Sequence, residues 1–152
     1  MDAPFWWIQP GFNKQSSEIV NEDGTSREGP QLPTIKYGHA IVSVNSTVSI
    51  LTGGYDLYAT NDSDQTTWYF NHATQKFKPG PNLLEGRSGH SSGTITDHET
   101  KEKIVLVSGG YNKEGSWNSQ YLKSTEILLN GEWVTGKIHK NLHIFHFFLQ
   151  CT

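Results

Sequence analysis

Three histidines near the end of the chain have the spacing of a candidate metal site. His139, His143 and His146 recur at i, i+4 and i+7, which would place them on one face of a short helix. Imidazole nitrogens are common ligands of zinc and copper. Apart from Cys151, the neighbouring sequence supplies no carboxylate or thiolate to complete such a site. We therefore expect no metal and no other cofactor in this protein.

Two further histidines each follow a glycine, as Gly38-His39 and Gly89-His90, and they lie 51 residues apart (90 − 39 = 51). Either imidazole has the chemistry of a general base. Their equivalent positions in a repeated pattern favour a structural role instead, in which each imidazole makes hydrogen bonds within or between the repeated units. We expect Lys36 and Arg87 to be structural as well, pairing with carboxylates of loops rather than with a substrate.

The acidic residues form no catalytic or ion-binding pattern. Asp56, Asp62 and Asp64 lie in one polar stretch, but the glycine and distal glutamate of a calcium loop do not follow them. Glu18 and Glu126 occupy equivalent positions, and we expect both to be polar residues at strand edges. No phosphate-binding, zinc-protease or nucleophile motif is present. The sequence thus predicts no catalytic residue and no enzymatic activity.

The chain repeats a phrase in which an apolar run ends in paired glycines and a tyrosine. The glycine pairs that begin at residues 53 and 109 lie 56 residues apart (109 − 53 = 56), five more than the histidines. The polar stretch 96–101 is the expected insertion. The other recurring anchors are Gly29-Pro30 with Gly80-Pro81, and SILTGGY at 49–55 with VLVSGGY at 105–111.

A period of about fifty residues, with Gly-His before one strand, Gly-Gly after the next and an aromatic residue in the last, resembles the kelch repeat. Kelch units are the four-stranded blades of β-propellers. The resemblance covers about residues 17–136 and implies an all-β fold, an incomplete kelch-type β-propeller of four-stranded antiparallel blades. It divides the chain into the end of a preceding partial blade (1–34), two kelch blades (35–85 and 86–136) and an off-pattern tail (137–152).

Short apolar runs bounded by turn residues predict the individual strands. We expect a strand at each of 17–20, 40–44, 48–51, 68–70, 90–96, 104–108 and 124–129, and short final strands around Phe77 and Trp133. Asn130-Gly131 is the strongest hairpin pattern. The paired glycines should end their strands where a side chain would block the next blade. In the tail, Ile138, Leu142, Phe145 and Leu149 fall at helical spacing and favour a short amphipathic helix.

Composition restricts the function classes further. The 15 glycines, 5 tryptophans, 6 tyrosines and 7 phenylalanines among 152 residues favour β-structure with many turns. The net charge is −3 with both signs scattered, so no basic stripe marks a nucleic-acid site. No apolar run reaches the roughly 18 residues of a membrane-spanning helix. The single cysteine excludes an internal disulfide and leaves the compartment undefined.

The kelch resemblance implies a protein-interaction module, because kelch propellers most often bind other proteins through loops at one face. A rigid stack of blades holds such loops in fixed relation, which suits recognition. We expect the contacting loops at 55–65 and 111–122. The candidate contact residues are Tyr55, Asp56, Tyr58, Asp62, Tyr111, Lys113, Trp117 and Asn118.

Two alternatives accompany this interpretation. One is a fragment of a kelch-propeller enzyme, either an oxidase, such as the copper oxidases that resemble galactose oxidase, or an enzyme that processes a small molecule. The sequence offers neither the metal ligands nor the convergent acid groups that such enzymes need. The other is a truncated product without independent function, suggested by the loss of the pattern after Gly136. An arc of blades would leave strand edges and apolar faces uncovered, so we also expect the isolated chain to associate with itself.

Overall fold

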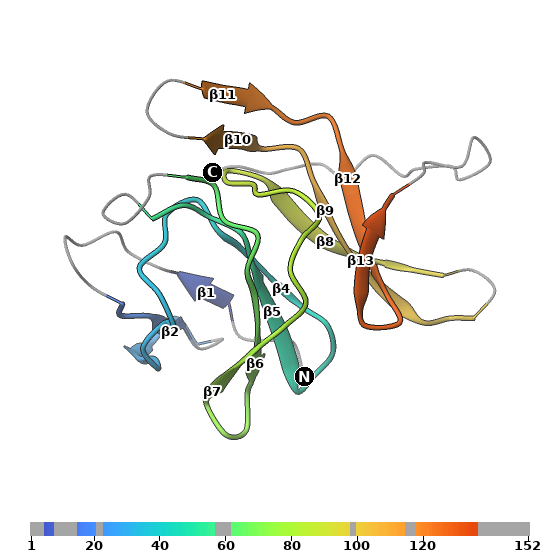
Figure 1. Ribbon diagram of the computed structural model, residues 1–152. Helices are drawn as coiled ribbons and strands as arrows, with labels where there is room; N and C mark the ends of the chain where they lie inside the picture. The colour runs from blue at the N-terminus through green and yellow to red at the C-terminus, as the bar shows by residue number, and fades with distance from the viewer. Residues whose placement is uncertain are drawn as a thin grey trace.

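All regular structure in the described part of the chain is antiparallel β-sheet, as shown in the computed structural model of Figure 1. The described residues are 5–7, 15–20, 23–56, 62–97, 100–114 and 118–136. They form three sheets and one separate hairpin. The predicted all-β class and the four-stranded antiparallel sheets are therefore confirmed.

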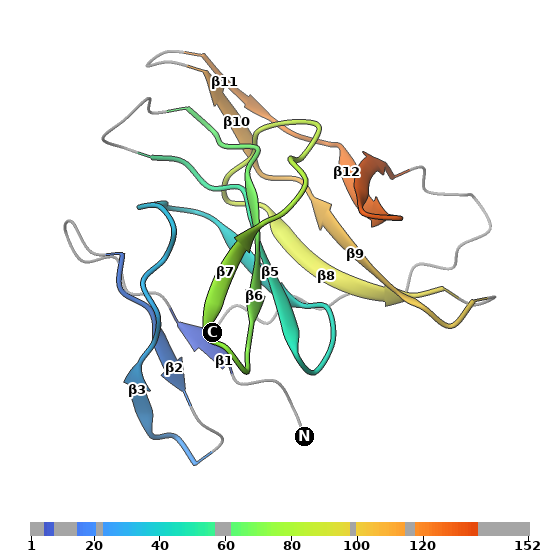
Figure 2. The same cartoon turned by 60° about the horizontal axis from the view of Figure 1, so that its bottom comes forward.

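The three sheets follow one another along the chain, and each pairs its strands in the order in which they occur in the sequence. Figures 1 and 2 show the middle sheet lying between the other two. The N-terminal sheet contains β1 (Phe5–Trp7), β2 (Glu18–Val20) and β3 (Ser26–Glu28). The middle sheet contains β4 (Ala40–Ser43), β5 (Val48–Thr52), β6 (Thr67–Asn71) and β7 (Lys76–Pro79). The C-terminal sheet contains β8 (Ser91–Thr96), β9 (Lys103–Ser108), β12 (Thr125–Leu129) and β13 (Glu132–Thr135).

The fourth element is a hairpin of β10 (Tyr111–Glu114) and β11 (Asn118–Tyr121), which projects from the end of the C-terminal sheet. The sequence predicts a loop over 111–122, and the stretch does join β9 to β12, but residues 111–114 and 118–121 pair as strands within it. The sequence does not reveal these strands, because it lacks the alternation of apolar and polar residues that identifies a half-buried strand. Among the described strands, these two pair only with each other and not with the rest of the C-terminal sheet. Residues 111–114 and 118–121 thus form a two-stranded antiparallel ribbon.

Turn chemistry determines where the strands reverse. Asn130 and Gly131 join β12 to β13 with φ angles of 52° and 82°, the left-handed pair that a tight hairpin requires. The predicted insertion at 96–101 lengthens the β8–β9 hairpin, which pairs six residues on each strand where β4 and β5 pair four. Both turn predictions are confirmed.

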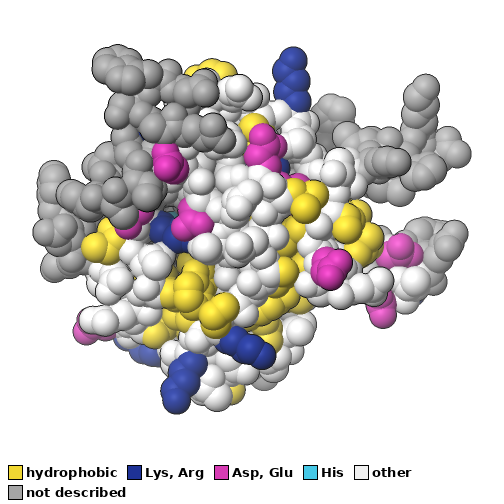
Figure 3. Space-filling model, viewed as in Figure 1, with side chains coloured by type: hydrophobic (Ala, Val, Ile, Leu, Met, Phe, Trp, Pro, Cys, Tyr) yellow, Lys and Arg dark blue, Asp and Glu magenta, His cyan; other side chains and the backbone are white. Residues whose placement is uncertain are grey.

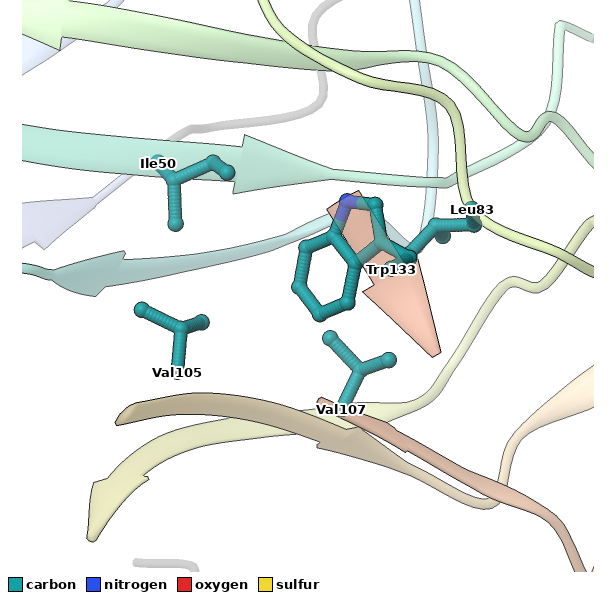
Figure 4. Packing of buried hydrophobic residues seen from close by; sticks show 5 residues of the cluster. All are labelled: Ile50, Leu83, Val105, Val107 and Trp133. Carbon is teal, nitrogen blue, oxygen red and sulfur yellow. The ribbon is translucent and has the colours of Figure 1, made fainter. Parts of the chain in front are cut away.

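The main core lies between the middle and C-terminal sheets. Ile50 of β5 faces Val105 of β9, and the Trp133 ring of β13 lies beside Val107 of β9 and Leu83, which follows β7 (Figure 4). These five side chains are at most 4% exposed. Apolar residues from two facing sheets thus exclude water between them, which is the largest favourable term in folding.

Paired glycines let the middle and C-terminal sheets approach closely. Gly53 has φ 58°, and a Cβ there would lie 2.3 Å from the carbonyl oxygen of Arg87 in the segment that leads to β8. Gly54 donates its N–H to that same oxygen at 2.8 Å. The expected role of these glycines at the junction between units is confirmed.

A second recurring position of the repeat, also a glycine, directly follows the last strand of each sheet. The N–H groups of Gly29, Gly80 and Gly136 donate to the carbonyl oxygens of Ser17, Thr67 and Thr125 at 2.8, 2.9 and 2.7 Å. The hydroxyls of Ser17 and Thr67 also donate to the carbonyl oxygens of Pro30 and Pro81. A Cβ on Gly29 or Gly80 would lie within 2.5 Å of the Ser17 or Thr67 hydroxyl oxygen. The same contact in three sheets makes the repeat a feature of structure as well as sequence.

Candidate protein-interaction site

The predicted contact loops lie at the same end of their sheets. The stretch 55–65 joins β5 to β6, and the stretch 111–122, which contains β10 and β11, joins β9 to β12. Within the described chain, the opposite ends of these sheets carry tighter turns, such as 72–75 and 130–131. We call the end formed by 55–56, 62–65 and 111–114 the two-loop surface.

Ser63 fastens the two loops to each other. Its N–H donates to the carbonyl oxygen of Lys113 at 2.8 Å, and the N–H of Lys113 donates to the Ser63 hydroxyl oxygen at 2.9 Å. The same hydroxyl donates to the carbonyl oxygen of Tyr111 at 3.2 Å. Three hydrogen bonds therefore fix residues about fifty positions apart, and the two loops form a single surface.

Three tyrosine rings continue this joint across the base of the loops. Tyr55 lies between Tyr37 and Tyr111, with ring centroids 5.7 Å and 6.4 Å away. Tilted rings at such distances attract one another, and this attraction adds to the favourable free energy of burying their surface. The backbones of Tyr37 and Tyr55 exchange hydrogen bonds at 2.9 Å, as do those of Ser88 and Tyr111. The aromatic row and the paired backbones make the base of the surface rigid.

A buried lysine holds the base of the first loop. The Lys36 ammonium, on a side chain only 2% exposed, lies 2.6 Å from the Asp64 carboxylate and donates to the Thr66 hydroxyl. Burial raises the pKa of Asp64, but hydrogen bonds from Lys36 and the Thr66 amide outweigh it and hold that pKa below its usual value. The predicted pairing of Lys36 with a loop carboxylate is confirmed.

Arg87 occupies the equivalent position in the C-terminal sheet, 51 residues on (87 − 36 = 51). Its guanidinium is fully buried and donates to the Glu126 carboxylate at 2.6 Å and to the Gly109 carbonyl oxygen at 2.9 Å. Glu126 also accepts the amides of Leu84 and Glu85 at 2.7 and 3.2 Å. This pair joins the segment entering β8 to β12 and supports the second loop from below.

The predicted strand-edge position of Glu18 and Glu126 is wrong. Glu126 is 3% exposed and lies in β12, which pairs with strands on both sides, and Glu18 lies in the central strand β2. A carboxylate is stable inside the sheet at Glu126 because Arg87 neutralises it there. Arg87 accordingly pairs with a strand carboxylate, and the loop residue Glu85 lies farther away at 3.9 Å.

The two glycine-linked histidines have structural partners, as predicted. His90 lies 2.8 Å from the Thr52 hydroxyl oxygen of β5 through its Nε2, which joins two sheets. His39 contacts the carbonyl oxygen of Lys36 through its Nδ1 at 3.2 Å, within its own unit. Burial lowers the pKa of His39. Burial and then the nearby Arg87 charge lower the pKa of His90 to about 4, so this imidazole is neutral at physiological pH.

The neutral His90 predicts a loss of stability in acid. An unfolded histidine has a pKa of 6.5, and the folded value is about 4, so the unfolded state binds more protons between these values. The stability contribution is complete above pH 6.5 and is lost as the pH falls toward 4. Between pH 7 and 4, the free energy of unfolding measured with urea should fall by about 3 kcal/mol more for the native chain than for His90→Gln. Equal pH dependence in the two proteins would contradict this assignment.

The structure brings together part of the predicted contact set. Tyr55 and Tyr111 lie next to each other, and Asp56, Asp62 and Lys113 are half-buried in the two-loop surface. Tyr58 and Trp117 lie outside the described residues. Asn118 belongs to β11, opposite Glu114, and its side chain also lies outside the described part.

Two residues that hold the loops together were not predicted from the sequence. Tyr37 lies where the next unit has Ser88, so the repeat pattern gives no reason to select it. Ser63 is one of several small polar residues in its loop, and its partners are backbone atoms of residues 111 and 113. Such contacts depend on how the sheets are stacked, which side-chain types alone do not specify.

Within the described residues, no group of three histidine, cysteine, aspartate or glutamate side chains could hold a metal ion. The three tail histidines and Cys151 lie outside those residues, as does the predicted tail helix. The described chain also contains no helix that is long and apolar enough to cross a membrane.

Comparison with protein-family models gives no match, and comparison with curated proteins gives none either. The bonds that tie residues 62–66 and 111–113 to the two sheets are therefore the observations from which a function can be argued. They describe a surface on which the described residues of two loops are joined by hydrogen bonds and supported by buried charge pairs.

Proposed function

We propose that this chain is a protein-interaction module, a segment of a kelch-type β-propeller that binds another protein through the two-loop surface. The observation that carries the proposal is the fastening of one loop to the other by Ser63. A surface fixed before binding loses little conformational entropy when a partner arrives, so more of the contact energy remains as affinity.

The sequential sheets support the kelch part of the proposal. The middle and C-terminal sheets each pair their strands in chain order, and each has a buried cation before its first strand, Lys36 or Arg87. Each also has glycines after its second strand and a glycine after its fourth. Matching contacts at matching positions are expected of a repeated structural unit.

The chemistry of the surface favours a polar partner. Asp56, Asp62 and Lys113 supply both signs of charge around the row of tyrosine rings. Interfaces of this kind use aromatic residues for contact area and charges at the rim for specificity and rate of association.

A charge reversal on the two-loop surface provides the test, with a matched reversal at the other end of the sheet. Lys113→Glu should reduce recovery of the bound partner at least about tenfold, because like charges across an interface cost several kcal/mol. Lys76→Glu, an equal change on exposed β7 at the far end, should leave recovery unchanged. The measurement is quantitative capture on the full chain, with thermal unfolding of each variant as the control for folding.

Equal loss of the partner from both variants, or from neither, would contradict the proposed surface. Stoichiometric copper or iron in the purified chain, together with turnover of a small substrate, would favour the alternative of a kelch-propeller enzyme.

A further inference from the structure

The C-terminal sheet has one buried face and one face that the other described residues leave partly exposed. Strand pairing places Leu106, Ile127 and Val134 in one row on the second of these, which we call the outer face. Val134 is 37% exposed, whereas Val107 on the inner face is 0% exposed. Figure 3 shows hydrophobic side chains at the surface over β12 and β13. The remaining apolar residues that pairing assigns to the outer face are Ile95, Ile104 and Leu129.

The equivalent face of the middle sheet is covered by the sheet that follows it in the chain. Leu106 lies 56 residues after Ile50, the same spacing as the paired glycines (106 − 50 = 56). Ile50 is 0% exposed because the C-terminal sheet covers it, and Leu51, on the opposite face of β5, is 2% exposed. The middle sheet is thus covered on both sides. The outer face repeats the pattern of a covered face, and large apolar patches of this kind are usually interaction sites.

The chain that follows β7, the last strand of the middle sheet, runs into the space between the middle and C-terminal sheets. After β7, Leu83 inserts beside Trp133 in the core between the middle and C-terminal sheets. Its N–H donates to the carbonyl oxygen of Gln65 at 2.8 Å, and after β3 the N–H of the buried Leu32 donates to Gln15 in the same way at 2.7 Å. The corresponding route after β13 would bring the chain that follows it to the outer face.

The composition of residues 137–152 fits that face. Ile138, Leu142, Phe145 and Leu149 recur at helical spacing and would form one apolar stripe. The segment contains two lysines and no acidic residue, so its charge is +2, and the rest of the chain carries −5 (10 basic and 15 acidic residues). Glu132, at the margin of β13, is the charged residue that strand pairing places on the outer face. Apolar contact and charge therefore favour the same partner.

We propose that residues 137–152 dock on the outer face of their own C-terminal sheet and cover Leu106, Ile127 and Val134. The segment would take the place that the C-terminal sheet takes on the middle sheet. Tethering makes the docking intramolecular, with an effective concentration of about millimolar for a short connection, so a modest contact is sufficient. This inference does not depend on the proposed partner of the two-loop surface.

The single cysteine allows a direct test on the full chain. A nitroxide attached to Cys151, within the segment, should broaden the methyl resonances of Leu106 and Ile127 far more than those of Leu51 in the middle sheet and of Leu32, which follows β3. The broadening should persist at low protein concentration. It should not appear in an isotopically labelled chain without nitroxide when that chain is mixed with the nitroxide-labelled chain. Uniform or absent broadening would overturn the proposal.

Two lysine substitutions on β13 provide matched variants, because pairing places Val134 on the outer face and Thr135 on the other. Val134→Lys removes an apolar contact and opposes the cationic segment, so it should lower the docked-to-undocked ratio at least about tenfold. Thr135→Lys should retain the broadening. Phe145→Lys should abolish the broadening without any change in the sheet.

A second copy of the chain is the competing occupant of the outer face. It would give a solution mass of two chains, together with broadening that passes from a labelled chain to an isotopically labelled one on mixing. That result would overturn docking of residues 137–152 within one chain.

Discussion

Replacing Glu126 by leucine lowers the free energy of unfolding by about 3–5 kcal/mol, because the buried Arg87 guanidinium keeps its charge and loses its closest carboxylate. Arg87 is 0% exposed and cannot turn toward water without opening the sheet. The amides of Leu84 and Glu85 lose their acceptor as well. Urea unfolding followed by tryptophan fluorescence measures the change.

The double variant Arg87→Met/Glu126→Leu separates the buried charge from the lost hydrogen bonds. Removing both ions takes away the buried charge, so the double variant should be more stable than Glu126→Leu alone. The amides of Leu84 and Glu85 still lack their acceptor, so it should remain less stable than the native chain. A double variant whose loss equals the sum of the single losses would show that the two side chains act independently.

Substituting Gly53 by alanine destabilises the protein by about 2–5 kcal/mol, through backbone strain and a clash between sheets. The residue has φ 58°, and the new Cβ would meet the Arg87 carbonyl oxygen at 2.3 Å and the His90 ring at 2.8 Å. Both contacts belong to the segment that leads into the C-terminal sheet. The methyl group therefore forces the two sheets apart, and thermal unfolding should show the loss.

Gly109→Ala is the matched control, because Gly109 has the same place in the next unit and a similar φ of 67°. Among the described atoms, its Cβ would meet only the Leu122 carbonyl oxygen, at 3.8 Å. The backbone strain is shared, so this variant should lose only about 1–2 kcal/mol. Equal losses at the two glycines would mean that sheet stacking contributes nothing at Gly53.

The strands and their turns could be predicted because their determinants are local. Alternating and apolar runs give β5, β9 and β12, and Asn130-Gly131 determines a hairpin by its backbone preference alone. The paired glycines by themselves indicate a close approach between units, because a residue without a side chain at the end of a strand needs such a reason. Whether the sheets belong to a kelch propeller stays a prediction.

The candidate site could be predicted only in outline. The sequence places loops at 55–65 and 111–122, but neither the β10–β11 pairing nor the Ser63 bridge follows from residue types. Both depend on the relative position of two sheets. Glu126 shows the same limit, since a glutamate in a strand indicates an exposed position until a buried arginine 39 residues earlier in the chain is known to face it.

The pairing of strands in chain order affects how the molecule is assembled. Within each sheet the strands pair in chain order, so pairing within a sheet closes shorter loops than the contacts between sheets do. The Gly54–Arg87 and Ser63–Lys113 bonds join the middle and C-terminal sheets across these longer loops. Each sheet is therefore stabilised by contacts with its immediate neighbours, as in a one-dimensional array of repeats. The middle sheet is covered on both sides, so it should be the last of the three to unfold.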